Sequence, residues 1–416
     1  MWSHLNKNGI KLPKITAEEI DKKVDPILRG MEKEGIKLDV KVLDKLAKET
    51  ETKIAKLEKE IHTLAKSDFN ISSPIQMAEV LFEKLKLPTE GLKKTKSGFS
   101  TAAMELKKLE SKHKIIKPIL EYRELSKLLN TYLLPLPKMV DKNSRLHTTY
   151  GQDTTTGRMN SSNPNLQNIP IKGEWGGEIR KAFVASPGMI LVAGDYSQIE
   201  LRVVACMAED AAMTKSFQSG EDIHARTAAE IFSVEAKKVT PDQRRIAKTV
   251  NFGVLYGMSP YGLSQALSIS QEDAAKYISK YFEVHQGIKT YCHNTVEYAK
   301  KHGYVETLFG YRRKFSNLHS PIRSLAESEA RMAFNAPVQG TAAEILKLAM
   351  IELNKKLSNS KMLLTIHDEI VVEAPEEKAK EIAKLMKETM ENVAKLCVPI
   401  EVSVETGKSL GDMEEI

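Results

Sequence analysis

Two aspartates, Asp195 and Asp368, stand at the ends of predicted strands, where a carboxylate could do chemistry. Asp195 closes the apolar run MILVAGDYS, and Asp368 lies with His367 and Glu369 between the β-prone runs KMLLTI and IVVEAP, which predict a hairpin. Two carboxylates from separate strands can hold a pair of divalent cations, an arrangement that supports phosphoryl transfer. Each aspartate alone is equally typical of a turn or a helix cap, so other motifs must decide between these interpretations.

A predicted helix over residues 242–257 carries a second candidate group. Four of its side chains are spaced four apart and share one slowly winding face: Arg244, Lys248, Phe252 and Tyr256. The cations could bind triphosphate oxygens, and the rings could contact a sugar or a base. The alternative is an ordinary amphipathic helix, but Gly253 and Gly257 count against it. Glycine inside a helix costs about 1 kcal/mol relative to alanine, which suggests that something approaches the backbone closely.

The elements that position these groups follow from changes in composition along the chain. Before residue 145, Lys, Glu and Leu recur with helical periodicity. The run TTYGQDTTTGRMNSSNPNLQNIP then marks a junction, and beyond it a strand ending at Asp195 leads into the helical segment SQIELRVVACMA. This order of elements predicts an α+β protein of two or three domains.

Composition sets further bounds. The net charge of +7 is compatible with a polyanionic partner but does not require one. Cys206, Cys292 and Cys397 are odd in number and lack metal-ligand spacing, so we expect neither disulfides nor a zinc site, and a reducing, cytoplasmic location. No apolar run has the length of a signal peptide or a membrane span.

Three segments resemble the signature motifs of family A DNA polymerases, the group of bacterial DNA polymerase I: GDYSQIELR (194–202), RRIAKTVNFGVLYG (244–257) and TIHDEIVVE (365–373). The resemblance continues through TTTGRMNSSNPNLQNIP, EDIHARTA, GYVETLFGYRR and RMAFNAPVQGTAAEILK, and covers nearly the whole chain. It implies a right-hand α+β fold with a helical thumb, a palm with a mainly antiparallel sheet, and helical fingers. The implied division is an N-terminal remnant (1–15), mainly thumb (16–145), first part of the palm (146–205), fingers (206–320) and second part of the palm (321–416).

The same resemblance implies roles for individual residues. Asp195 and Asp368 would bind two Mg²⁺ ions, or Mn²⁺, with help from the backbone carbonyl of Tyr196, and Glu369 would lie nearby as a further catalytic residue. Lys248 would be the general acid for the leaving pyrophosphate. The implied nucleotide-binding residues are Arg244, Lys248, His224, Phe252, Glu200, Tyr256 and Gln198. The implied DNA-binding residues are Arg158, Gln167, Asn168, Gln339, His367 and Asn335.

Some of these roles have a physical content that can be tested. Glu200 would crowd a 2′-hydroxyl and so select deoxyribose, although it could also be an ordinary helical glutamate paired with Arg202. Phe252 lacks the hydroxyl of a tyrosine, which predicts poor acceptance of dideoxynucleotides. Arg158, Gln339 and His367 would donate to purine N3 and pyrimidine O2, acceptors that every correct base pair presents in the minor groove.

The resemblance therefore implies a monomeric DNA-directed DNA polymerase that uses primed template DNA and dNTPs. Because only about fifteen residues precede the thumb, no proofreading or 5′ nuclease activity is expected. Tyr311 departs from the family, which often has arginine there. The alternatives are a single-subunit RNA polymerase-like enzyme, a metal-dependent nuclease, and a DNA-binding module without activity.

Overall fold

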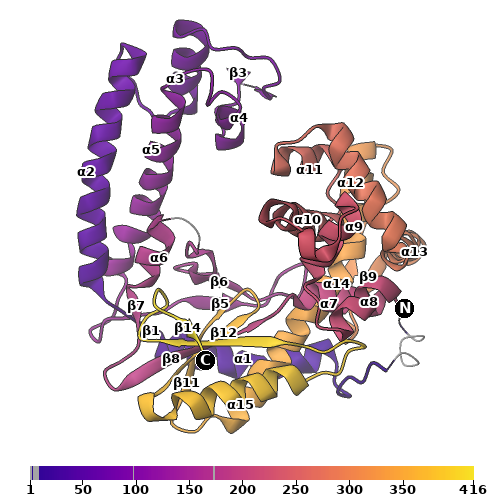
Figure 1. Ribbon diagram of the computed structural model, residues 1–416. Coiled ribbons are helices and arrows are strands. Elements are labelled where there is room, and N and C mark those ends of the chain that lie inside the picture. Colours follow the sequence, from indigo (N-terminus) through magenta and orange to yellow (C-terminus); the bar gives the residue numbers. More distant parts are fainter. Residues whose placement is uncertain (1, 3–8, 97, 172–173) are drawn as a thin grey trace.

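A five-stranded antiparallel sheet lies at the base of the protein, in a computed structural model that describes residues 2, 9–96, 98–171 and 174–416 (Figure 1). The strand order is β11-β12-β8-β13-β14. The strands are β8 (Met189–Tyr196), β11 (Lys361–Ile366), β12 (Glu369–Pro375), β13 (Val402–Gly407) and β14 (Glu414–Glu415). The predicted strand before Asp195 and the predicted hairpin around Asp368 are both confirmed.

Strand β8 is covered on both faces, which fixes how its side chains point. Leu191 and Ala193 lie in one apolar cluster together with Val371 of β12. On the opposite face, a Cβ at Gly194 would lie 2.6 Å from Sδ of Met386, because α15 (Ala379–Asn392) packs directly against the backbone there. Asp195 therefore continues the face of Leu191 and Ala193, at the point where the covering cluster ends.

Two groups of helices rise above the sheet on opposite sides (Figure 1). On one side stand α2 (Val40–Ala65) and α5 (Ile116–Leu128), with α3 (Pro74–Ala78), α4 (Ala103–Lys107) and the hairpin of β2 (Lys94–Thr95) and β3 (Gly98–Phe99) near their tips. On the other side lie α8 (Ala211–Gln218), α9 (Ile223–Phe232), α10 (Pro241–Leu255), α11 (Pro260–Leu267), α12 (Gln271–Val284) and α13 (Gln286–His302). Helices and antiparallel sheets together confirm the α+β class.

The remaining elements lie around the base. Helices α1 (Ala17–Glu34) and α14 (Arg323–Lys356) share the main apolar core with the sheet, and α7 (Ile199–Met207) directly follows β8. Short strands complete this region, together with helix α6: β1 (Ile36–Leu38), β4 (Arg145–Leu146), β5 (Thr149–Gly151), β6 (Asn160–Ser162), β7 (Phe183–Val184), β9 (Tyr304–Glu306), β10 (Arg312–Lys314) and α6 (Glu174–Arg180). In the described part of the chain, no helix is long and apolar enough to cross a membrane.

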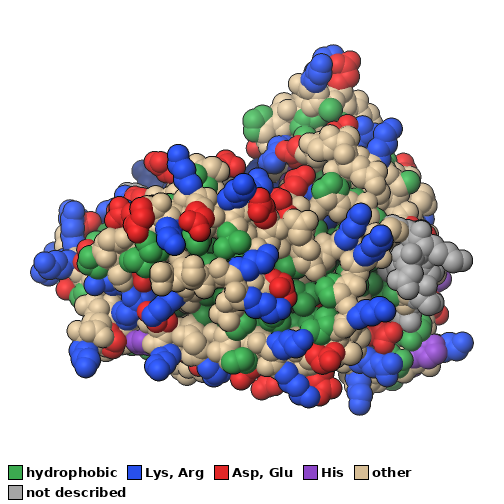
Figure 2. Space-filling model, turned by 90° about the horizontal axis from the view of Figure 1, so that it is seen from below, with side chains coloured by type: hydrophobic (Ala, Val, Ile, Leu, Met, Phe, Trp, Pro, Cys, Tyr) green, Lys and Arg blue, Asp and Glu red, His purple; other side chains and the backbone are tan. Residues whose placement is uncertain are grey.

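The lower face of the molecule carries mixed charge. Figure 2 shows lysine and arginine interspersed with aspartate and glutamate over this face, with small apolar areas between them. The net positive charge of the chain is therefore not gathered here into one continuous basic surface.

Helix α10 begins and ends for local reasons. Thr240 and Gln243 form a reciprocal capping box, and Pro241 follows at the first helical position. The helix stops at Leu255, two residues before the predicted end, because Gly257 adopts φ +66°. A Cβ at Gly257 would meet the Arg331 side chain at 2.5 Å. The close approach predicted at this glycine is therefore made by α14 of the protein itself.

The prediction that the cysteines form no disulfide is wrong. Cys206, near the end of α7, and Cys397, before β13, are joined by a disulfide across a sequence separation of 191 residues. The pattern of cysteines could not reveal this pair, because only the tertiary fold brings the two segments together. Cys292 is a free cysteine.

Reduction of the Cys206–Cys397 disulfide should lower the stability of the protein. Closing a loop this long restricts the unfolded chain, and a disulfide typically contributes about 2–4 kcal/mol. Thermal unfolding with and without dithiothreitol should therefore show a lower midpoint in the reduced protein. The variant Cys397→Ala should show no response to the reductant, and an equal response in both proteins would contradict the assignment.

Candidate active site

A cavity of about 800 Å³ lies between the sheet and the helices α9 and α10. It brings together most of the residues that the sequence singled out, drawn from segments up to about two hundred positions apart. The predicted residues that line it are Arg158, Gln167, Asp195, Tyr196, Gln198, Glu200, His224, Arg244, Lys248, Phe252, Tyr256, His367, Asp368 and Glu369.

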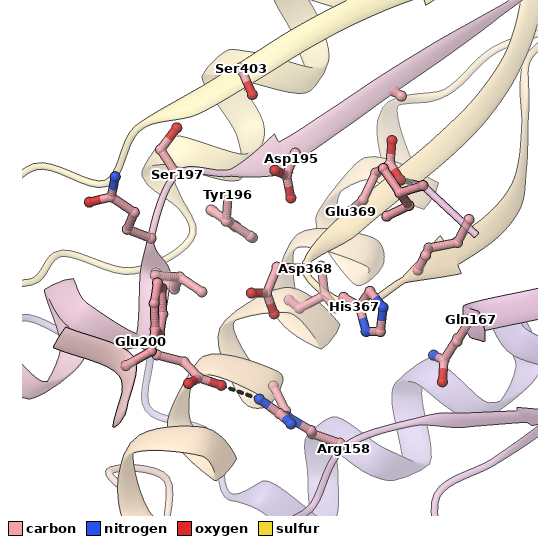
Figure 3. A pocket seen from close by; sticks show the side chains of 18 of the residues that line it. Arg158, Gln167, Asp195, Tyr196, Ser197, Glu200, His367, Asp368, Glu369 and Ser403 are labelled. Carbon is pink, nitrogen blue, oxygen red and sulfur yellow. Dashed lines mark hydrogen bonds and ion pairs between the residues drawn. The ribbon is translucent and has the colours of Figure 1, made fainter. Parts of the chain in front are cut away.

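The acidic residues meet through strand pairing. In the antiparallel register, Asp195 of β8 lies opposite Glu369, the first residue of β12. Asp368 precedes Glu369 in the turn, and its carbonyl accepts a hydrogen bond from the backbone N–H of Tyr196 at 3.3 Å. Figure 3 shows Asp195, Asp368 and Glu369 among the side chains that line the cavity. The sheet therefore places two carboxylates from separate strands side by side, as the sequence predicted.

These carboxylates lie in an environment that disfavours their charge. Enclosure in the cavity raises the pKa of Asp368 to about 7, and the nearby Glu200 and Asp195 charges add to this shift while Arg158 opposes it. Enclosure likewise raises the pKa of Glu369 to about 7, against the effect of Arg180, and the pKa of Asp195 is also raised. A bound cation would stabilise the ionised form of these acidic groups and so lower their pKa values.

The donor set fits magnesium. Across the described residues, no three His, Cys, Asp or Glu side chains are grouped as a complete metal site. Asp195 and Asp368 with the carbonyl of Tyr196 instead offer a partial set of oxygen ligands. Mg²⁺ commonly binds through one or two carboxylates and completes its shell with water and substrate phosphates. The residues present are therefore compatible with Mg²⁺ that arrives together with a phosphate ligand.

Glu200 is engaged by residues of the cavity and not by its helix neighbour. Glu200 is 4% exposed, and its carboxylate pairs with the Arg158 guanidinium (Figure 3). The carboxylate also accepts a hydrogen bond from the Tyr256 hydroxyl at 2.7 Å. Arg202 instead pairs with Glu401 and donates to Pro399 O at 2.6 Å. The alternative of an ordinary Glu200–Arg202 helix pair is thus ruled out by the geometry.

The cationic face of α10 is braced by α9. Asp222 caps α9 through the His224 backbone N–H, at 2.8 Å, and its second carboxylate oxygen accepts from Nε of Arg244 at 2.7 Å. Phe252 packs near the His224 ring, with centroids 5.8 Å apart, and stacks on Tyr256 at 6.3 Å. The stripe predicted from the sequence therefore faces the cavity as one unit.

Three predicted DNA-binding residues lie outside the lining of this cavity. The backbone carbonyl of Asn168 accepts from the Tyr132 hydroxyl. Asn335 and Gln339 lie on α14, both half-buried, and Oδ1 of Asn335 has no hydrogen-bond partner within the described ranges.

Other residues of the site were missed from the sequence. Arg180, Ser403 and Glu405 also line the cavity. Ser403 lies opposite Asp195 in the register of β13 with β8. Strand pairing distant in sequence places Ser403 and Glu405 there, whereas Arg180 comes from the end of α6.

A buried lysine supports the segment that carries Arg158. Lys347 of α14 is 1% exposed, and its Nζ lies 2.6 Å from a carboxylate oxygen of Asp21 and 2.8 Å from Gly157 O. The Tyr311 hydroxyl donates to Thr154 O at 3.0 Å. Tyr311, which stands where an arginine was expected, thus also binds the segment that carries Arg158.

His224 should make the stability of the protein depend on pH. It is 1% exposed, and burial, with Lys248 and Arg244 nearby, lowers its pKa from 6.5 to about 4 although Asp222 opposes this. Because the unfolded chain takes up this proton more readily, the free energy of unfolding should fall as the pH drops from 6.5 to about 4.

The variant His224→Gln should flatten that fall by up to about 3 kcal/mol. Chemical denaturation of both proteins between pH 4 and 7 measures the difference. The exposed His293→Gln on α13 is the control and should follow the wild type; identical pH curves for His224→Gln and the wild type would refute the assignment.

The chain is similar in sequence to a family of known proteins. The model of DNA polymerase family A matches residues 40–412. DNA polymerase I of Deinococcus radiodurans is 46% identical over 399 residues, covering 95% of this chain and 42% of the relative. The thermostable DNA polymerase I of Thermus aquaticus is 46% identical over 394 residues, covering 94% of this chain and 47% of the relative. The chain thus spans about half the length of the curated relatives it matches.

A solved structure shows the same architecture. The POL domain of Pol1 from M. smegmatis, in complex with DNA primer-template and dNTP, superposes with a TM-score of 0.90 at 38% identity. The match covers 94% of this chain and 70% of that one, and it confirms the right-hand polymerase fold. The chain belongs to DNA polymerase family A.

Proposed function

We propose that this chain adds deoxynucleoside 5′-triphosphates to the 3′ end of a DNA primer, as directed by a template strand. The observation that carries the proposal is a juxtaposition: one cavity holds the Asp195–Asp368 pair on its floor and the cations Arg244 and Lys248 on a helix beside it. A nuclease would need the acids but would leave the cationic helix without a role. The complex of the M. smegmatis domain with primer-template and dNTP supports the same ligands here.

In this proposal, the residues of α10 and α9 bind and orient the triphosphate. Arg244, Lys248 and His224 contact its oxygens, and Phe252 lies against the sugar. Lys248 donates the proton that the leaving pyrophosphate requires, a contribution of about 10² to 10⁴ in rate for a well-placed acid. Gln198, which directly precedes α7 and lines the same cavity, also contacts the nucleotide.

Asp195, Asp368 and the Tyr196 carbonyl would hold two Mg²⁺ ions, with Mn²⁺ as a substitute, and Glu369 would lie next to them. When bound, the two metal ions would neutralise the charge that develops on the phosphate and favour attack by the primer hydroxyl. The raised pKa values of Asp368 and Glu369 support this role, because a cation favours the ionised form.

Tyr256 occupies the position that a templating base would need. Its hydroxyl contact with Glu200 ties α10 to α7, so entry of a base requires this contact to open and α10 to move. Closure of α10 over the nucleotide would then exclude water from the site.

DNA contacts complete the assignment. Arg158 and His367 line the cavity near the acids and, with Gln339 of α14, would read the minor-groove edge at the primer end. Gln167, which also lines the cavity, would contact DNA together with Asn168 and Asn335. We further propose that the protein acts as a monomer. A cytoplasmic location follows from where DNA and dNTPs are available.

The variant Asp368→Asn should reduce the rate of primer extension by more than about 100-fold in the presence of Mg²⁺. Its thermal midpoint should not fall, because the change removes one of two carboxylates that repel each other. Single-nucleotide extension of a primed template, with and without chelator, measures the first effect. The exposed Asp44→Asn on α2 should behave as the wild type, and retained activity in Asp368→Asn would end the proposal.

Discrimination between sugars tests Glu200. Wild-type protein should incorporate dNTPs far better than NTPs on the same primed template, which also excludes the RNA polymerase alternative. Glu200→Ala should raise NTP incorporation at least about tenfold relative to dNTP, since it removes the side chain that would crowd the 2′-hydroxyl. An unchanged ratio would show that Glu200 does not select the sugar.

The phenylalanine at position 252 should make the enzyme reject dideoxynucleotides. Phe252→Tyr would supply a hydroxyl where the substrate lacks its own, and should reduce discrimination against ddNTPs by about tenfold or more. The ratio of kcat/KM for ddNTP and dNTP measures this. Phe282→Tyr, on α12 and outside the cavity lining, is the matched control; equal acceptance of both substrates by the wild type would be the contrary result.

A further inference from the structure

A chain of buried polar side chains connects α9 and α10 behind the cavity. Thr227, Asn251 and His224 are each no more than 1% exposed. The Thr227 hydroxyl oxygen lies 2.8 Å from Ile223 O and 3.2 Å from Oδ1 of Asn251, so these two acceptors share its single proton. The amide Nδ2 of Asn251 lies 2.9 Å from Nδ1 of His224. Such a fully buried polar chain is costly unless each group has a partner, so its orientation matters.

The other ring nitrogen of His224 is left without a partner in the described part of the chain, at the edge of the cavity. Nε2 is buried and has no hydrogen-bond partner among the described residues, and His224 lines the cavity together with Arg244 and Lys248. A neutral imidazole carries its single proton on one nitrogen only. The partner of Nδ1 therefore decides whether Nε2 presents an N–H donor or a lone pair to whatever enters.

We propose that Asn251 is a positioning residue: its amide donates to Nδ1 of His224 and so holds the ring as the Nε2–H form, a ready donor for a triphosphate oxygen. The proposal rests on the proposed nucleotide-binding function. Asn251 touches no substrate in it; it acts through His224, and Thr227 acts through Asn251 by occupying the amide oxygen.

The opposite amide orientation would suit a bound phosphate less well. If the amide of Asn251 were turned over, its oxygen would accept from a protonated Nδ1, and Nε2 would present a lone pair beside Arg244 and Lys248. A lone pair repels phosphate oxygens, whereas an N–H attracts them. Burial, which lowers the pKa of His224 to about 4, keeps the ring neutral, so it cannot donate from both nitrogens at neutral pH.

The tautomer can be read directly in the wild-type protein. Nitrogen NMR of protein labelled at histidine, with His224 assigned from the His224→Gln variant, should show an unprotonated Nδ1 and a protonated Nε2 at pH 7. This measurement requires no activity, so it is separate from the test of the proposed function. The reverse pattern, a protonated Nδ1, would overturn the proposal.

Kinetics then test whether Asn251 acts through His224. Asn251→Leu keeps an approximate shape but removes the donor, and should raise KM for dNTP about fivefold to twentyfold with kcat changed less than about threefold. In the His224→Gln background the same substitution should have little further effect on KM, because its target is already gone. Ser264→Ala, which removes another buried hydroxyl of the fingers region, is the matched control and should leave KM unchanged.

The outcomes separate cleanly. Equal effects of Asn251→Leu in the wild-type and His224→Gln backgrounds would show a purely structural role and overturn the proposal. If Asn251→Leu does not fold, as judged by its thermal unfolding, Thr227→Val tests the same chain one step further away, with a smaller rise in KM expected and no rise counting against it. Wild-type protein that extends no primer would instead refute the proposed function, whatever the tautomer.

Discussion

The pairing of β8 with β12 is the constraint on which the rest of the site depends. It sets Asp195 opposite Glu369 and so brings Asp368 into the same cavity. A shift of one residue would turn Leu191 and Ala193 out of their apolar cluster and Asp195 away from the cavity, because side chains alternate along a strand. The packing of α15 against Gly194 makes such a shift still more costly. The burial of these apolar residues thus keeps Asp195 and Asp368 in one cavity although their like charges repel each other.

The two sides of the cavity carry opposite charges, which do not neutralise each other directly. The acids lie on the sheet, and the cations of α10 are braced by α9, where Asp222 already engages Arg244. The raised pKa of Asp368 reflects this separation, since Arg158 only partly offsets burial and the neighbouring acids. A ligand that carries both phosphate and divalent cation would satisfy both sides at once. That complementarity is a physical reason to expect a nucleotide with its metal.

Much of the site could be predicted because its signals are local. A strand that ends at a carboxylate, a hairpin with an acid in its turn, and a helix with cations every fourth residue are all visible in short windows of sequence. The contacts of Glu405 and Lys347 were not predictable, because strand order and the packing of α1 on α14 create them. The Cys206–Cys397 disulfide was missed for the same reason: cysteines in two ordinary segments become neighbours only when α7 packs against the segment that precedes β13.

The most direct test of the account is to locate the metal. Crystals of the protein with primed template and a non-hydrolysable dNTP, soaked in Mn²⁺, would be measured at the manganese absorption edge. The account predicts two anomalous peaks about 3.5 to 4 Å apart between the carboxylates of Asp195 and Asp368. Peaks located elsewhere, or carboxylates that bind no ion while nucleotide is present, would contradict the claim that strand register builds a two-metal site.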